Sequence, residues 1–186
     1  NTVGTDINIT PDGEIYVATM DDGLLKSADA GKSYAAVYPA KGYDRRINGH
    51  VWSVRRLVEN KLIATASPWY DQTNQIVLVN AKDGRFQVIR KGLPGTRPKV
   101  NTMWEEGYSR ALAVDPKDPK KIYLGIDGND GGGLYISNNS GNAWEYSKGQ
   151  PASRRIFNAL AVDPTDSNRI FLGAYSETDD TGGIYL

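Results

Sequence analysis

The hexapeptide ALAVDP occupies residues 111–116 and recurs unchanged at residues 159–164, 48 positions further along the chain. The similarity continues downstream, because KIYLG at residues 121–125 returns as RIFLG at residues 169–173 with the same displacement. A fixed period of roughly 20 to 50 residues indicates one supersecondary unit that is copied along the chain. The fold must therefore be interpreted as an array of similar units.

The segments of each unit have the composition of β-strands. They are short, rich in β-branched and aromatic residues, and bounded by Gly, Asp, Asn or Pro, as in GEIYVATM at residues 13–20. No long stretch has an apolar period of about 3.6 residues, so we expect an all-β chain built from units of four strands. The strands expected in the four units span residues 6–10, 14–20, 24–27 and 33–38; 51–58, 61–67, 75–80 and 86–90; 110–114, 121–126, 133–137 and 143–147; and 157–162, 169–174 and 183–186.

A second signature lies between the third and fourth strands of a unit. SADAGKSY at residues 27–34 and SNNSGNAW at residues 137–144 share the form Ser-x-Asp/Asn-x-Gly-x-x-aromatic, and NAKDGRF at residues 80–86 is a shorter version. A short Asx side chain can accept bonds from backbone N–H groups of its own turn, and Gly supplies a positive φ. We expect these turn residues to be structural: Ser27, Asp29, Gly31, Tyr34, Ser137, Asn139, Gly141 and Trp144.

These turns resemble the Asp-box repeat, also called the BNR repeat, whose ideal form is Ser-x-Asp-x-Gly-x-Thr-Trp. Asn139 and Tyr34 depart from that form, and Thr is absent from the seventh position of both turns. The wider repeat is similar to the propeller blades of xyloglucanase-type glycoside hydrolases, sortilin-type receptors and photosystem assembly factors. The resemblance implies an all-β fold, a β-propeller of four-stranded antiparallel blades in one partial domain over residues 1–186. About four blades are expected, the last one incomplete, near residues 4–40, 46–92, 108–149 and 155–186.

Composition removes several classes of function. The 22 Lys and Arg residues balance 22 Asp and Glu residues, so the chain has no net positive field for nucleic acid or an anionic membrane surface. No apolar run approaches the roughly 20 residues of a membrane span, so we expect no membrane insertion. Cysteine is absent and His50 is the single histidine, which excludes thiol nucleophiles and cysteine-based zinc sites.

We expect a ligand to bind where the second strand of a blade leads to the third and where one blade leads to the next. These connections are unusually long in places, and long loops on a rigid scaffold are often functional. They contain aromatic residues with flat apolar faces and arginines that can hold acidic groups. The candidate ligand-binding residues are Arg45, Arg46, Trp69, Tyr70, Trp104, Tyr108, Arg154, Arg155 and Tyr175.

Catalysis by this chain alone has a single candidate base. Asp127, in YLGIDGNDGGGLY, occupies the place of the base in the xyloglucanase type of blade. Glycoside hydrolysis needs a second carboxyl group about 5 to 10 Å away. By loop position alone, the possible partners are Asp21, Asp22, Glu105, Glu106, Glu177, Asp179 and Asp180. Asp127, Asn129 and Asp130 could also supply oxygen ligands to Ca²⁺, but their spacing is not that of an EF-hand loop, and we expect no resident metal or cofactor.

The fourth unit stops before its fourth strand, which leaves an unfinished array. The expected partners are further blades from the same longer polypeptide or, alternatively, from another copy, together with a glycan or protein ligand. The resemblance implies an exported protein in the periplasm, at the cell surface or outside the cell. The expected function is a binding or scaffold module; the alternatives are part of a xyloglucanase-like or sialidase-like glycoside hydrolase and a structural subunit of a surface assembly.

Overall fold

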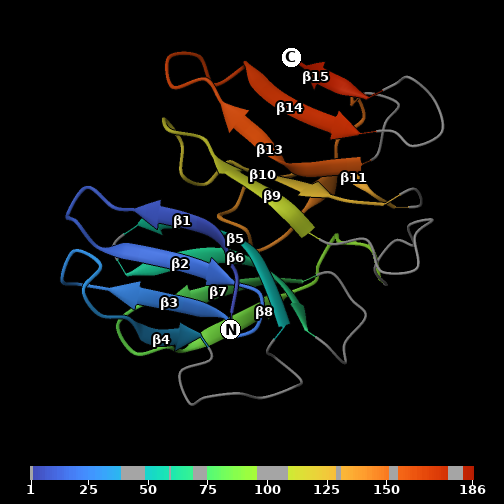
Figure 1. Ribbon diagram of the computed structural model, residues 1–186. Coiled ribbons are helices and arrows are strands. Elements are labelled where there is room, and N and C mark those ends of the chain that lie inside the picture. The colour runs from blue at the N-terminus through green and yellow to red at the C-terminus, as the bar shows by residue number, and fades with distance from the viewer. Residues whose placement is uncertain are drawn as a thin grey trace.

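The computed structural model describes residues 2–38, 49–58, 60–68, 75–95, 109–128, 131–150, 155–175 and 182–186. The regular structure of these residues is entirely β, in four antiparallel sheets that follow one another along the chain (Figure 1). The strands are β1 (Gly4–Ile9), β2 (Ile15–Thr19), β3 (Leu24–Ser27) and β4 (Ala35–Tyr38); β5 (Gly49–Val58), β6 (Lys61–Pro68), β7 (Gln75–Asn80) and β8 (Phe86–Ile89); β9 (Ser109–Val114), β10 (Ile122–Ile126), β11 (Gly133–Ser137) and β12 (Glu145–Tyr146); and β13 (Arg155–Val162), β14 (Ile170–Tyr175) and β15 (Gly183–Tyr185).

Within each sheet the strands are ordered as they are in the sequence, from β1 to β4, β5 to β8, β9 to β12 and β13 to β15. The first strands of successive sheets contact each other, β1 with β5, β5 with β9, and β9 with β13. They form the inner edge of the array, and β4, β8 and β12 lie at the outer edge (Figure 1). This architecture is a four-bladed β-propeller arrangement, which confirms the predicted fold class. The described residues include no helix that could span a membrane.

Apolar side chains fill the space between blades on both faces of each inner sheet. In the second blade Leu62 and Ala64 pack against the first blade, whereas Ile63 between them packs against the third. In the third blade Leu124 belongs to the contact with the second blade and Tyr123 to the contact with the fourth. All five side chains are completely buried. The alternation of a strand therefore places successive apolar residues in different inter-blade cores, and full burial of each large one stabilises the fold by about 1.5 to 3 kcal/mol.

The first of the two similar turns is held by side chains of its own residues. The Ser27 hydroxyl donates to Oδ1 of Asp29 over 2.7 Å and accepts from the backbone N–H of Gly31 over 2.9 Å. Asp29 also accepts from the backbone N–H of Ser33 over 2.9 Å. Ala30 and Gly31 both have positive φ, 57° and 85°.

The second turn repeats this geometry. Ser137 donates to Oδ1 of Asn139 over 2.9 Å and accepts from the N–H of Gly141 over 3.0 Å, while Asn139 accepts from the N–H of Ala143 over 2.9 Å. Ser140 and Gly141 have φ values of 58° and 81°. The amide oxygen of Asn139 thus takes the role that the carboxylate oxygen of Asp29 has in the first turn, because both oxygens only accept hydrogen bonds there.

The aromatic residues that end the two turns have different surroundings. Trp144 is 3% exposed and packs in the core between the second and third blades. Tyr34 is 46% exposed. The predicted strand at residues 143–147 is also shorter, because the N–H of Ala143 bonds to Asn139 and that of Trp144 to the carbonyl of Lys91 in the second blade.

Candidate functional site

The strand order separates the connections into two groups at opposite ends of the blades. We call the end with the turns after the first and third strands, such as residues 10–14 and 28–34, the turn face. The opposite end is the loop face, where ligand binding was predicted. Its connections include residues 39–48, 69–74, 96–108, 129–130, 151–154 and 176–181, which lie outside the described residues.

Most of the predicted ligand-binding residues fall in those segments. Arg155 and Tyr175 are the exceptions, since they stand directly opposite each other on β13 and β14 at the loop face. The predicted residues outside the described part are Arg45, Arg46, Trp69, Tyr70, Trp104, Tyr108, Asn129, Asp130 and Arg154.

Each first strand is irregular near the loop face. The register shifts around Thr5 in β1, between Val51 and Val54 in β5, around Arg110 in β9, and between residues 156 and 160 in β13. Bulges of this kind redirect a side chain and are enriched beside active sites. In the second blade, the Thr65 hydroxyl accepts bonds from the backbone N–H groups of Trp52 and Ser53. The innermost strands therefore share a local distortion at the end where ligand binding was predicted.

Three residues at this end form a cluster, which we call the Arg110 cluster: the half-buried Trp52 and the buried Arg110 and Asp127. The guanidinium carbon of Arg110 lies 4.3 Å from the centre of the Trp52 ring, a cation–π contact between the second and third blades. Nε of Arg110 lies 3.4 Å from Oδ2 of Asp127, and the two side chains are 10% and 0% exposed. Asp127 directly follows β10, so the bulge in β9 and the end of β10 bring the two charges together.

The burial of Asp127 affects its predicted role as a general base. A general base must reach the proton that it removes, directly or through one water. Asp127 exposes none of its side chain and is held by a cation. Asp127 is therefore better placed to orient the Arg110 side chain than to contact a substrate.

Trp52 and Arg110 were not predicted from the sequence as site residues. The sequence did contain a signal for Arg110, because the repeat changes at this position: Arg110 precedes the first copy of ALAVDP and Asn158 precedes the second. A charged residue at the start of an otherwise apolar strand, where the repeat changes, marks a position with its own role.

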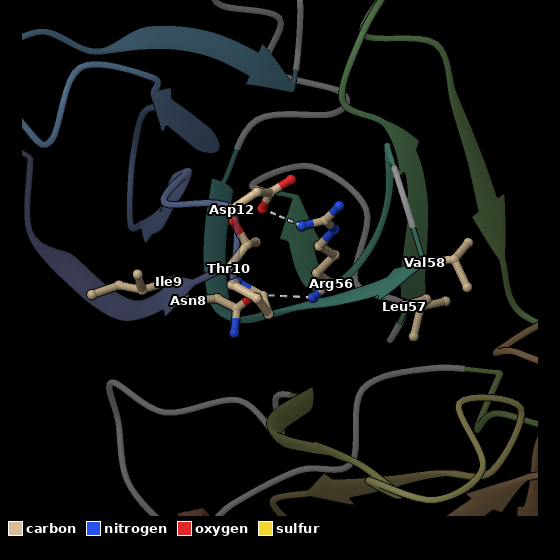
Figure 2. Close-up of a pocket in the computed structure, with 8 residues that line it drawn as sticks. Asn8, Ile9, Thr10, Asp12, Arg56, Leu57 and Val58 are labelled. Atoms are coloured by element: carbon tan, nitrogen blue, oxygen red, sulfur yellow. Dashed lines mark hydrogen bonds and ion pairs between the residues drawn. The ribbon is translucent and has the colours of Figure 1, made fainter.

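A pocket of about 500 Å³ opens at the turn face, beside the ends of the innermost strands β1 and β5 (Figure 2). Asp12 and Arg56 point toward each other in it, with Nη1 of Arg56 2.5 Å from Oδ1 of Asp12. The Asn8 amide oxygen accepts the backbone N–H of Arg56 over 3.1 Å and joins the two blades. The pocket is lined by Asn8, Ile9, Thr10, Pro11, Asp12, Arg56, Leu57 and Val58.

Hydrogen bonds favour the charged forms of Asp12 and Arg56 in this pocket. Bonds from Thr10 and from Arg56 lower the pKa of Asp12 to about 2, and the bond to Asp12 raises the pKa of Arg56. The two shifts widen the pH range over which the ion pair persists. The described residues contain no group of three or more His, Cys, Asp or Glu side chains suited to a metal ion.

Comparison with known proteins identifies structural similarity only. No protein-family model and no curated protein matches the chain. The GH74 xyloglucanase from Xanthomonas campestris superposes with a TM-score of 0.64 and 21% identity, over 92% of this chain and 25% of that one. The extracellular domain of BT4673 from B. thetaiotaomicron superposes with a TM-score of 0.61 and 17% identity, over 96% of this chain and 20% of that one. YCF48 bound to D1 peptide superposes with a TM-score of 0.56 and 13% identity, over 91% of this chain and 47% of that one.

The chain thus spans from a fifth to about half of the length of these structures. At such identities the similarity concerns the fold. It agrees with the blade arrangement described above: the chain has the fold of a β-propeller.

Proposed function

We propose that this chain is an Asp-box propeller module that recognises a glycan or protein ligand on its loop face and serves as a binding or scaffold unit of an exported protein. The observation that carries the proposal is the Arg110 cluster. It lies at the inner edge of the loop face, where the first strands are bulged, and it fixes an arginine on an aromatic ring between two blades. Rigid strands thus support the end of the fold from which the long loops leave.

Two further observations favour this proposal. The loop-face connections are rich in aromatic residues and arginine, the residue types that form contacts with sugars, acidic groups and peptides. The same fold occurs in YCF48 with a bound D1 peptide and in an extracellular domain, BT4673. The assignment to the Asp-box type is supported by the matching bonds of the turns at Ser27 and Ser137.

A glycan array and a peptide array, each probed with the full chain, test the proposal. For a ligand found in this way, we expect Tyr175→Ala to weaken binding about tenfold or more, as for an aromatic anchor. Tyr34→Ala is the matched control, because Tyr34 is an exposed tyrosine at the turn face, and it should leave the affinity unchanged. Equal losses in the two variants would contradict binding on the loop face.

The second candidate is a glycoside hydrolase, favoured by the position of Asp127 directly after β10. A hydrolysis assay on the sugars of the same array separates the two candidates. Binding without turnover is the expected result. Turnover that disappears in a folded Asp127→Asn variant would overturn the proposal, and a purely structural subunit would give neither binding nor turnover.

A further inference from the structure

A second hollow at the turn face lies between the second and third blades. Its volume is about 540 Å³, within the range of about 300 to 1,000 Å³ that is usual for ligand pockets. Both of these blades have a neighbouring blade on each side in the structure, so the walls of the hollow do not depend on further blades. We call it the amide groove, after the side chains that line much of it: Asn60, Lys61, Asn80, Arg85, Gln87 and Asn142.

Three turns of the turn face hold the walls of the amide groove in place. The turn between β5 and β6 is tied to the turn between β7 and β8, because the carbonyl of Asn60 accepts the N–H of Ala81 over 2.9 Å. The turn after β11 supplies Asn142, whose Nδ2 donates to the carbonyl of Asn139 over 2.6 Å. Walls that are fixed in advance lose little entropy when a ligand binds, so the groove is preorganised.

The amide side chains of the groove keep hydrogen-bonding groups available for a ligand. Within the part of the chain that the structure describes, the side chain of Gln87 makes no hydrogen bond. Asn80 uses only Oδ1, which accepts the N–H of Lys82 over 2.9 Å, and Asn142 uses only Nδ2. An amide offers both donors and an acceptor, and a hydroxyl group also does both. The groove therefore matches a ligand that is rich in hydroxyl groups.

The charge of the groove indicates which hydroxyl-rich ligand fits best. The half-buried Lys61 forms no ion pair with any described residue. Arg85 pairs with Asp83, which lies outside the groove, and the described lining residues include no carboxylate. An anionic group in the groove can thus take charge-assisted hydrogen bonds from both cations. Phe86, which is 40% exposed, adds an apolar surface for the carbon atoms of a sugar ring.

We propose that the amide groove binds an acidic saccharide, in which a sugar ring carries a carboxylate or sulfate group. The anionic group is held by Lys61 and Arg85, and the hydroxyl groups by the amides of Asn80, Gln87 and Asn142. The number of amides favours a saccharide over an acidic peptide, which carries few hydroxyl groups. The groove lies at the end of the blades opposite the loop face, so this proposal does not rest on the function proposed above.

Titrations followed by ¹H–¹⁵N NMR spectra of the full chain test the proposal. The probes are a galacturonate trimer, a sulfated galactose trimer, a neutral galactose trimer and a glutamate trimer. We expect one of the two acidic saccharides to bind and to shift the backbone amides of residues 60–61, 80, 87 and 142, with the neutral and peptide trimers about tenfold weaker or more. Equal affinity for the neutral or the glutamate trimer, or shifts confined to other residues, would overturn the proposal.

Variants of the groove separate a specific site from general attraction of anions. Gln87→Glu should fold, because the side chain is exposed and makes no hydrogen bond with the described residues, and should raise the dissociation constant for the acidic trimer about tenfold or more. Lys61→Gln should act in the same direction. Lys82→Gln is its matched control, since Lys82 is an exposed lysine of the same turn that lines the hollow toward the first blade instead.

The control should leave the affinity for the acidic trimer unchanged. Equal weakening by Lys61→Gln and Lys82→Gln would show that only the overall charge attracts the trimer and would overturn a site in the groove. Unchanged affinity in a Gln87→Glu chain whose amide spectrum shows the native fold would overturn it as well.

Discussion

Asp12 lies at the rim of the turn-face pocket and has a pKa of about 2, which is lowered most by a hydrogen bond from Thr10 and next by one from Arg56. Since the pKa in the folded protein lies below the ordinary value of 3.8, these bonds stabilise the fold above about pH 4 and are lost as the pH falls through 2. We expect the carboxyl carbon of Asp12 to titrate near pH 2 by NMR. In Arg56→Gln its midpoint should rise but stay below 3.8, because the bond from Thr10 remains.

Asp29 provides the internal control for that titration. Its pKa is also lowered to about 2, by bonds from Ser33 and Ser27, and none of these contacts involves Arg56. Its midpoint should be the same in the wild type and in Arg56→Gln. An Asp12 midpoint that does not move in the variant would contradict the ion pair with Arg56.

The buried pair of Asp127 and Arg110 predicts a large loss of stability when one partner is removed. Asp127→Ala leaves the Arg110 guanidinium, 10% exposed, without its carboxylate, and should lower the free energy of unfolding by about 3 to 5 kcal/mol. Addition of Arg110→Met should restore part of the loss, because no uncompensated charge then remains buried. Urea denaturation of the single and double variants measures both effects.

The control for this pair is Asp83→Ala. Asp83 pairs with Arg85 over 2.6 Å, but Arg85 is 84% exposed, so solvent screens the pair and the loss of stability should be far smaller than for Asp127→Ala. A similar small loss for Asp127→Ala would contradict the burial of the Arg110 cluster.

At the scale of elements, the junction between the second and third blades depends on a close backbone approach at Gly92. Gly92 has a φ of 82°, and a Cβ there would lie 1.8 Å from the carbonyl oxygen of Trp144. The adjacent carbonyl of Lys91 accepts the N–H of Trp144 over 3.1 Å. Gly92→Ala should therefore separate the two blades and lower the free energy of unfolding by more than about 3 kcal/mol.

Gly13→Ala isolates the cost of the backbone conformation. Gly13 has a similar φ of 85°, but nothing lies within 4 Å of its Cβ position. Only the left-handed strain of about 1 to 2 kcal/mol should appear in its thermal or urea unfolding. Equal losses of unfolding free energy in Gly92→Ala and Gly13→Ala would show that the close approach of Gly92 to Trp144 does not contribute to stability.

The strands could be predicted from the sequence because both faces of a blade are buried. Ile63 and Leu62 lie in different cores, yet both cores require apolar side chains, so the strand appears as a continuous apolar run. The length of β12 could not be predicted, because the N–H of Trp144 bonds to the second blade rather than to its own sheet. That bond depends on how two blades meet, which local propensity does not encode.

At the scale of the whole molecule, the site was only partly predictable for the same reason. The sequence indicated the loop face, but the contact between Trp52 and Arg110 joins residues 58 positions apart on different blades. Asp127 was identified as a candidate base from its place after a strand, but it is buried beside Arg110, which lies at the bulge in β9. Inter-blade geometry, rather than local pattern, decides what these side chains do.

The same geometry predicts how stability is distributed along the array. In repeat architectures each unit is stabilised mainly by its neighbours, so a blade with one covered face should open more readily than a blade with two. In dilute solution we expect amides of β2 and β14 to exchange with deuterium at least tenfold faster than those of β6 and β10. The latter strands carry the completely buried Leu62, Ile63 and Leu124.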